Sequence, residues 1–245
     1  MKLNCDLGES FGQWTMGHDE AIMPHIDMAN IACGFHAGDP LVINNTLTLA
    51  KQHNVMIGAH PSYPDLVGFG RRSIKCQSDE LIALLHYQIG AIDSMAKNHD
   101  LQLAYVKPHG ALYNDMMADS AIFTTVLTAL SQYHRPLKLM VLAGALSEES
   151  RALSHQFGVE LLHEAFADRR YQDSGALTPR SEEGAVLSEQ AMLAQVEQLL
   201  KHSTVVTHTG NTLNIVADTL CVHGDNLAAI AMIEKINALC QLART

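Results

Sequence analysis

The chain has 245 residues and a formal net charge of −10, with 47% hydrophobic and 17% charged residues. This length fits one α/β domain, so we expect a single domain over residues 1–245. The acidic balance disfavours nucleic acid and anionic membrane as partners, and the absence of an apolar run of 18 residues excludes a membrane span. Five cysteines without a CxxC pair, and Asp6 and Glu9 where a signal peptide needs its apolar core, favour a cytoplasmic location.

Short apolar runs recur along the chain, separated by segments long enough to form helices. Continuous apolar runs are typical of buried parallel strands. We expect seven such strands, at residues 2–6, 28–33, 55–59, 103–106, 137–142, 159–162 and 219–222. Helices are expected at residues 41–53, 78–98, 120–132, 147–157, 185–201 and 226–242, with Asp39 as the N-cap of the first and Pro40 at its first position.

Two further short runs, at residues 204–207 and 212–216, flank Thr209-Gly210-Asn211. They predict a β-hairpin that is not part of the alternating strands and helices. The alternation of strands and helices indicates parallel βα units. An open doubly wound sheet is the alternative to a barrel. We favour a seven-stranded parallel (β/α) barrel, because reactive residues follow almost every strand, whereas an open sheet gathers them at one switch point.

Ionisable residues at four strand ends are candidates for one site. Asp6 ends the first strand, His36 follows the second, His60 the third and His109 the fourth. Imidazole and carboxylate groups suit a divalent ion such as Zn, Mn or Ni. They serve equally as acid–base groups without metal, and no HxxxH or HExxH spacing decides between the two.

Lys107 also follows the fourth strand, where a lysine needs an anionic partner. That partner is either a substrate group or a carboxylate such as Glu164 or Asp6. Several other charged residues near the strand ends are candidates for substrate binding, in addition to Glu9: Asp168, Arg169, Arg170, Arg180 and Asp225. Solvated surface arginines, and an N-cap role for Asp225, are the alternatives.

Nucleotide-binding motifs are absent from the sequence. It contains no GxxxxGK[ST] and no GxGxxG, and it also lacks the GxSxG nucleophile elbow of serine hydrolases. Any nucleotide in the reaction is therefore not held by a P-loop or a Rossmann turn of this chain.

Long strings in the sequence resemble the LamB/YcsF family. They are NCDLGE at 4–9, NIACGFHAGD at 30–39, GAHPSYPD at 58–65, VKPHGALYN at 106–114, EAFADR at 164–169 and CVHGD at 221–225. The resemblance implies the seven-stranded barrel of the glycoside hydrolase/deacetylase type. It also implies a part in ATP-dependent 5-oxoprolinase activity, which opens 5-oxoproline to L-glutamate together with 5-oxoprolinase subunits B and C. ATP would be the co-substrate, with a divalent metal, Mg, accompanying it.

This chemistry needs a phosphate clamp, a base to activate water and an acid for the departing nitrogen. Lys107 and Arg169 are candidates for the clamp. Asp6 or His60 is the candidate base, and His36 or His109 the candidate acid; Arg170 or Arg180 is the candidate cation for the substrate carboxylate. Two alternatives remain: a stand-alone metal-dependent amidase or carbohydrate deacetylase, and a non-catalytic scaffold protein.

Overall fold

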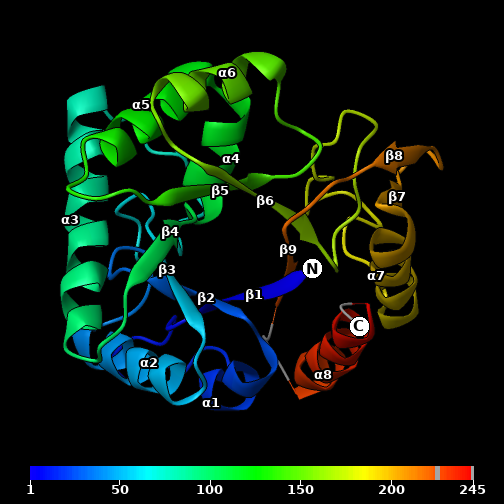
Figure 1. Ribbon diagram of the computed structural model, residues 1–245, viewed down its shortest axis with the longest axis horizontal. Helices are drawn as coiled ribbons and strands as arrows, with labels where there is room; N and C mark the ends of the chain where they lie inside the picture. Colours follow the sequence, from blue (N-terminus) through cyan, green and yellow to red (C-terminus); the bar gives the residue numbers. More distant parts are fainter. Residues whose placement is uncertain (224–226, 244–245) are drawn as a thin grey trace.

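Seven parallel strands form a closed barrel in the computed structural model, which describes residues 1–223 and 227–243 (Figure 1). The strands are β1 (Lys2–Leu7), β2 (Met28–Ala32), β3 (Met56–His60), β4 (Leu103–Val106), β5 (Lys138–Leu142), β6 (Leu161–Phe166) and β9 (Thr219–Val222). They pair in chain order, and β9 closes the barrel by pairing with both β6 and β1. This closure confirms the barrel and excludes the open sheet.

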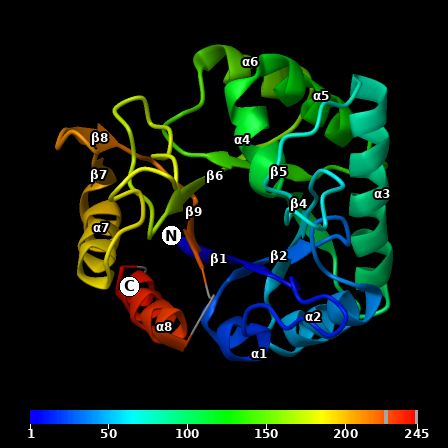
Figure 2. The same ribbon diagram turned by 180° about the vertical axis from the view of Figure 1, so that it is seen from behind.

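Helices surround the barrel and bury their apolar faces against it (Figures 1 and 2). They are α1 (Asp19–Ile22), α2 (Pro40–Gln52), α3 (Ser78–Lys97), α4 (Gly110–Ala118), α5 (Ser120–Ser131), α6 (Glu148–Gln156), α7 (Glu189–His202) and α8 (Leu227–Leu242), with a 3₁₀ turn η1 (Met23–His25). Asp39 caps α2 as expected, because its carboxylate accepts hydrogen bonds from Leu41 N and Val42 N.

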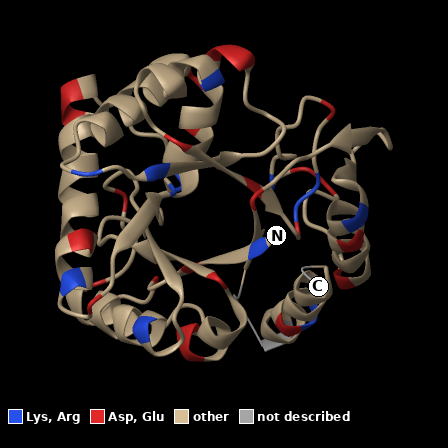
Figure 3. Cartoon of the chain, viewed as in Figure 1, with Lys and Arg blue, Asp and Glu red and all other residues tan. Residues whose placement is uncertain are grey.

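The predicted hairpin is confirmed: β7 (Thr204–Val206) and β8 (Thr212–Asn214) form a separate antiparallel pair beside α7, outside the barrel. Most lysine, arginine, aspartate and glutamate residues lie on the outer helices and in loops, and a few lie on the barrel strands (Figure 3). Among the described residues, no helix is both long and apolar enough to cross a membrane.

Several elements differ from the sequence-based expectation. The short helix α1 and the 3₁₀ turn η1 lie where no helix was expected, and α7 begins at Glu189 and not at residue 185. The sixth strand, expected at residues 159–162, instead covers Leu161–Phe166. His163 and Glu164 are ionisable and suggest a loop, but Glu164 is fully buried and has a lysine counter-charge, so the strand continues through it. Helix α4 is an addition to the expected helices, because the preceding Lys107-Pro108-His109-Gly110 segment is typical of a loop.

A ladder of polar side chains crosses the barrel interior below its mouth. Asn4 donates to Thr219 Oγ1 at 3.0 Å, and Asn30 donates to Asn4 Oδ1 at 2.9 Å. Tyr105 donates its hydroxyl to Asn30 Oδ1 at 2.6 Å. Since buried polar groups need partners, this ladder fixes the side-chain orientations on which the functional groups rest.

Candidate active site

A cavity of about 760 Å³ lies at the carboxyl ends of the barrel strands. Its wall includes side chains from five different strands or the residues just beyond them: Asp6, His60, Lys107, Phe166 and His223. This is the end at which barrel enzymes carry their chemistry. The cavity is therefore the candidate active site.

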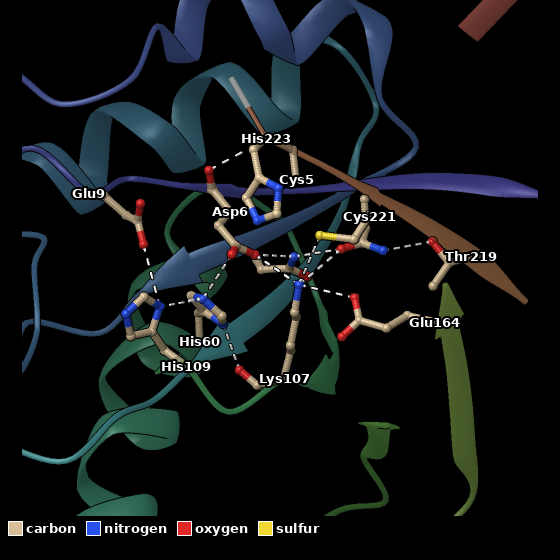
Figure 4. Close-up of polar contacts among 12 residues, drawn as sticks. Cys5, Asp6, Glu9, His60, Lys107, His109, Glu164, Thr219, Cys221 and His223 are labelled. Carbon is tan, nitrogen blue, oxygen red and sulfur yellow. Dashed lines mark hydrogen bonds and ion pairs between the residues drawn. The ribbon is translucent and has the colours of Figure 1, made fainter. Parts of the chain in front are cut away.

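Lys107 lies at the bottom of this cavity between two carboxylates (Figure 4). Its Nζ is 3.0 Å from Glu164 Oε2 and 3.1 Å from Asp6 Oδ1, and it also donates to Asn4 Oδ1 and Cys221 Sγ, both at 3.3 Å. Burial acts against the charged form, but Asp6 and the other nearby groups hold the pKa of Lys107 well above its usual value. The lysine is thus a fixed cation, and both carboxylate partners considered from the sequence are present.

Asp6 is held as a carboxylate by its neighbours. Its Oδ1 accepts from Asn30 Nδ2 at 2.7 Å, and its Oδ2 lies 3.4 Å from His60 Nε2. Although burial opposes ionisation, His60 and Lys107 hold the pKa of Asp6 well below its usual range. Asp6 therefore carries negative charge at neutral pH.

His60 and His109 face each other in an arrangement that requires a cation between them. His60 Nδ1 lies 2.7 Å from the Lys107 carbonyl oxygen, and His109 Nε2 lies 2.9 Å from that of Phe69. Because carbonyl oxygens only accept, both of these ring nitrogens carry hydrogen. The remaining nitrogens, His60 Nε2 and His109 Nδ1, face each other at 2.9 Å. Two lone pairs at this distance need a shared proton or a metal ion.

Glu9 and His36 complete a group of four with these two rings. Glu9 Oε1 is 3.2 Å from His36 Nε2 and 3.6 Å from His109 Nδ1, and the His36 and His109 rings stack with centroids 3.7 Å apart. One ligand atom from each of the four residues lies within 4.8 Å of the others. Glu9 is therefore the carboxylate that groups with all three histidines, whereas Asp6 contacts only His60 among them.

Burial keeps two of these imidazoles neutral. It lowers the pKa of His109 to about 3 and that of His36 well below its usual value, and neighbouring histidines add to both effects. Neutral imidazole is the form that ligates metals. A ligand role therefore suits His36 and His109 better than the role of proton donor.

Two guanidinium groups also line the cavity. Arg169 is buried and donates through Nη2 to Thr178 O at 2.7 Å, and the exposed Arg180 also lines the cavity. Burial, and next the charge of Arg180, lower the pKa of Arg169. Arg169 and Arg180 repel each other, and an anionic ligand that binds both would offset this repulsion.

The other candidates from the sequence lie away from the cavity surface. Asp168 pairs with His223 at 3.0 Å, and Arg170 donates to Gly184 O at 3.3 Å; neither Asp168 nor Arg170 lines the cavity. Glu164 lies fully buried beneath Lys107. Asp225 lies outside the described residues.

Comparisons with known proteins agree with this geometry. The LamB/YcsF family model matches residues 1–244. The chain belongs to the LamB/YcsF family. Curated relatives of this LamB/YcsF chain include the A subunit of 5-oxoprolinase from Vibrio cholerae serotype O1, which is 55% identical over 239 residues, covering 97% of this chain and 96% of the relative. A 5-oxoprolinase A subunit of Pseudomonas putida is 53% identical over 235 residues, covering 96% and 91%.

Among solved structures, the lactam utilization protein from Thermus thermophilus superposes on this LamB/YcsF chain with a TM-score of 0.91. The two are 35% identical, and the match covers 100% of this chain and 97% of that one. The strings that carry the family resemblance supply the groups at the barrel mouth, including Asp6, Glu9, His36, His60 and Lys107.

Sequence reasoning missed several residues of this LamB/YcsF cavity. Arg71 lies over the Phe69 ring at 5.3 Å and lines the cavity from the long loop after β3. Tyr113 and Phe166 line it from α4 and the end of β6. Aromatic residues in apolar segments are typical of the core, so nothing in the sequence indicated that Tyr113 and Phe166 line the cavity. An expectation of helix α4 and of the longer strand β6 would have placed them at the mouth.

Proposed function

We propose that this chain is one subunit of an ATP-dependent 5-oxoprolinase, which opens the lactam of 5-oxoproline to L-glutamate while ATP is hydrolysed to ADP and phosphate. The observation that carries the proposal is its 55% identity, over nearly the whole of both chains, to a relative named as the A subunit of 5-oxoprolinase. A barrel-mouth cavity with a fixed lysine, a fixed carboxylate and a wall of guanidinium groups supports it.

The residues suit the demands of this reaction. A lactam is an unactivated amide, and phosphate transfer to its carbonyl oxygen creates an electrophile that water attacks. Lys107 offers a fixed positive charge where negative charge develops, and Arg169 and Arg180 face an anionic group of the substrate. Asp6 is ionised and lies next to His60, so its carboxylate is the group in this pair that can orient water and accept a proton from it.

We further propose that Glu9, His36, His60 and His109 hold one divalent ion. Two backbone carbonyls fix the outer nitrogens of His60 and His109, which is the usual support for metal-ligating histidines. The facing lone pairs, together with the nearby Glu9 carboxylate, favour a cation at their centre. A bound ion would supply Lewis acidity next to the cavity.

Titration of Mn²⁺ or Zn²⁺ into chelator-treated protein tests this metal site. We expect one ion per chain, and His109→Ala should weaken its binding by at least about tenfold. His86→Ala is the matched control, because His86 bonds to the Ala129 carbonyl outside the cavity. Equal binding by both variants, or no binding by the parent protein, would rule the site out.

ATP and partner subunits belong to the same proposal. The relatives are named as subunits, and this sequence lacks a P-loop. We therefore propose that the chain works with 5-oxoprolinase subunits B and C, that Mg²⁺ accompanies ATP, and that the chain alone binds ATP weakly.

Glutamate formation from 5-oxoproline, measured with the chain alone and with both partners, tests the function. We expect glutamate only when all three subunits and ATP are present. A complete complex that releases no glutamate would refute the proposal. Lactam or amide hydrolysis by the chain alone without ATP would instead support the second candidate, a metal-dependent amidase or deacetylase, which the Glu9–histidine cluster favours.

A further inference from the structure

Opening a lactam requires a proton donor for the departing nitrogen, and the three histidines beside Glu9 do not suit this role. Burial lowers the pKa of His109 to about 3 and the pKa of His36 well below its usual value, so both rings are neutral. The inner nitrogen of His60 faces His109 Nδ1 at 2.9 Å and is committed to that contact. The proton donor must therefore come from another part of the cavity lining.

His223 lines the same cavity from the position just after β9. Its Nδ1 lies 3.0 Å from Asp168 Oδ2, and its ring stacks against the Phe166 ring with centroids 6.2 Å apart. Since an ionised carboxylate only accepts, this Nδ1 carries hydrogen. Among the described residues, only Asp168 forms a hydrogen bond with the ring, so Nε2 remains for the substrate.

The surroundings of His223 favour its protonated form. Burial opposes the charge, but the carboxylates of Asp168 and Asp6 hold the pKa of His223 above its usual value, although Lys107 acts against them. Glu9 is a further carboxylate within electrostatic reach of the ring. A small pocket of about 190 Å³, which His223 and Asp168 also line, is otherwise lined by apolar side chains, including those of β9, α7 and α8. In weakly polar surroundings of this kind, a charged hydrogen-bonded pair is stronger than in water.

We infer that His223 is the general acid that protonates the lactam nitrogen as the ring opens, and that Asp168 is its positioning residue. The inference rests on the proposed function and adds a catalytic group to it. Water adds to the activated carbonyl carbon and loses one proton to Asp6. The C–N bond then breaks, its electron pair stays on nitrogen, and nitrogen takes the proton from His223 Nε2. The new hydroxyl oxygen forms the C=O bond and gives its proton to water, and a second water later displaces the phosphate. Solvent restores the proton of His223 and removes that of Asp6.

Proton transfer to nitrogen decides which bond of the tetrahedral adduct breaks. Its central carbon carries both the phosphoryl oxygen and the ring nitrogen, and phosphate leaves far more readily than an unprotonated amine. Without an acid at nitrogen, loss of phosphate returns the lactam and consumes ATP without product. A general acid at this position therefore couples ATP hydrolysis to ring opening.

His223→Gln in the complete complex tests the inference, with glutamate and phosphate measured together. General acids contribute about 10²- to 10⁴-fold in rate, so glutamate release per folded complex should fall at least about a hundredfold. Phosphate release should fall less, so that the phosphate formed per glutamate rises. Glutamate release close to that of the parent, or an equal fall in both products, would overturn the inference.

Asp168→Asn supplies a readout that a purely structural role would not move. This change keeps the His223 ring but removes the charge that raises its pKa. A general acid acts only while it is protonated, so kcat is lost as pH rises through its pKa. The alkaline limb of the kcat–pH profile should therefore shift to lower pH in the variant, and an unshifted limb would contradict the positioning role.

His163→Gln is the matched control. His163 also lies near an aspartate, with its Nδ1 3.5 Å from Asp218 Oδ2, but it does not line the cavity. Its loss should leave glutamate release per folded complex and the phosphate formed per glutamate unchanged. The parent complex, measured alongside, separates the two proposals. Glutamate from the parent together with coupled, near-parental turnover by His223→Gln overturns the inference alone, whereas a parent complex that forms no glutamate overturns both.

Discussion

His223 and Asp168 link the ends of β9 and β6 through a pair that titrates. Burial opposes both charges, but Asp168 holds the pKa of His223 above its usual value, and His223 holds the pKa of Asp168 below its own. A raised histidine pKa adds stability that is complete below the unfolded pKa of about 6.5 and is lost as pH rises through the folded value. The lowered aspartate pKa adds stability above about pH 3.9 that is lost on further acidification.

We therefore expect His223→Gln to destabilise the chain more at pH 6 than at pH 9. Urea unfolding of the parent and the variant at both pH values measures this difference. His155→Gln, on the exposed surface of α6, should show no such dependence. A penalty for His223→Gln that is equal at both pH values would contradict the pairing.

Site residues could be predicted from the sequence where an ionisable side chain comes directly after an apolar run that forms a strand. His36, His60, His109 and Lys107 follow apolar runs, and the parallel order brings them to one mouth. The separation of Asp6 from Glu9 was not predictable. Asp6 lies near the end of β1 and Glu9 just beyond it, and only side-chain direction decides that Asp6 meets Lys107 and His60 whereas Glu9 meets His36 and His109.

At the scale of elements, the packing of the barrel interior requires a glycine in strand β3. A Cβ on Gly58 in β3 would overlap the Tyr105 ring, which crosses the interior and donates to Asn30. Gly90 in α3 is the opposite case, because a Cβ there meets no atom within 4 Å. The two glycines thus occupy different environments, although both lie inside regular elements.

Gly58→Ala should lower the free energy of unfolding by about 1–3 kcal/mol, since an overpacked core displaces its neighbours. Gly90→Ala should raise it by about 0.5–1 kcal/mol, since alanine is the better helix former. Urea denaturation of both variants measures these changes. A loss of stability in neither variant, or equal losses in both, would refute this account of β3.

The sequence predicted elements well where apolar pattern and capping agree, as for α2 with Asp39 and Pro40. It failed at β6 and α4 for related reasons. Glu164 is acceptable within a strand only because Lys107, far away in the sequence, supplies its counter-charge. Gly110 starts a helix directly after a proline-containing segment, and the first turn of that helix is held from the loop after β3, where Gly70 O accepts from Ala111 N at 2.9 Å. Long-range contacts such as these leave no local signal.

At the scale of the whole molecule, the acidic chain concentrates fixed cations at one cavity. The formal net charge is −10, yet Lys107, Arg169 and Arg180 all line the barrel mouth, and Arg71 joins them from the loop after β3. Two carboxylates, Asp6 and Glu9, also line the cavity, but the cationic side chains outnumber them, and an excess of one sign of charge attracts ligands of the opposite sign. The cavity is thus suited to a small anionic substrate, which agrees with the proposed role in opening 5-oxoproline.

Lys107→Met in the assembled complex tests the central claim that this cavity performs the chemistry. We predict a loss of at least about two orders of magnitude in ATP-dependent glutamate release, because a fixed electrostatic donor is removed. The melting temperature should also fall, since Asp6 and Glu164 lose their counter-charge.

Lys138→Met is the control, because that exposed lysine pairs with Glu160 at the start of β5. The decisive measurement is turnover per folded complex for the Lys107→Met and Lys138→Met variants. We predict activity close to that of the parent for Lys138→Met and a loss of about a hundredfold or more for Lys107→Met. Near-parental turnover by folded Lys107→Met complexes would contradict the claim and leave the lysine with a purely structural role.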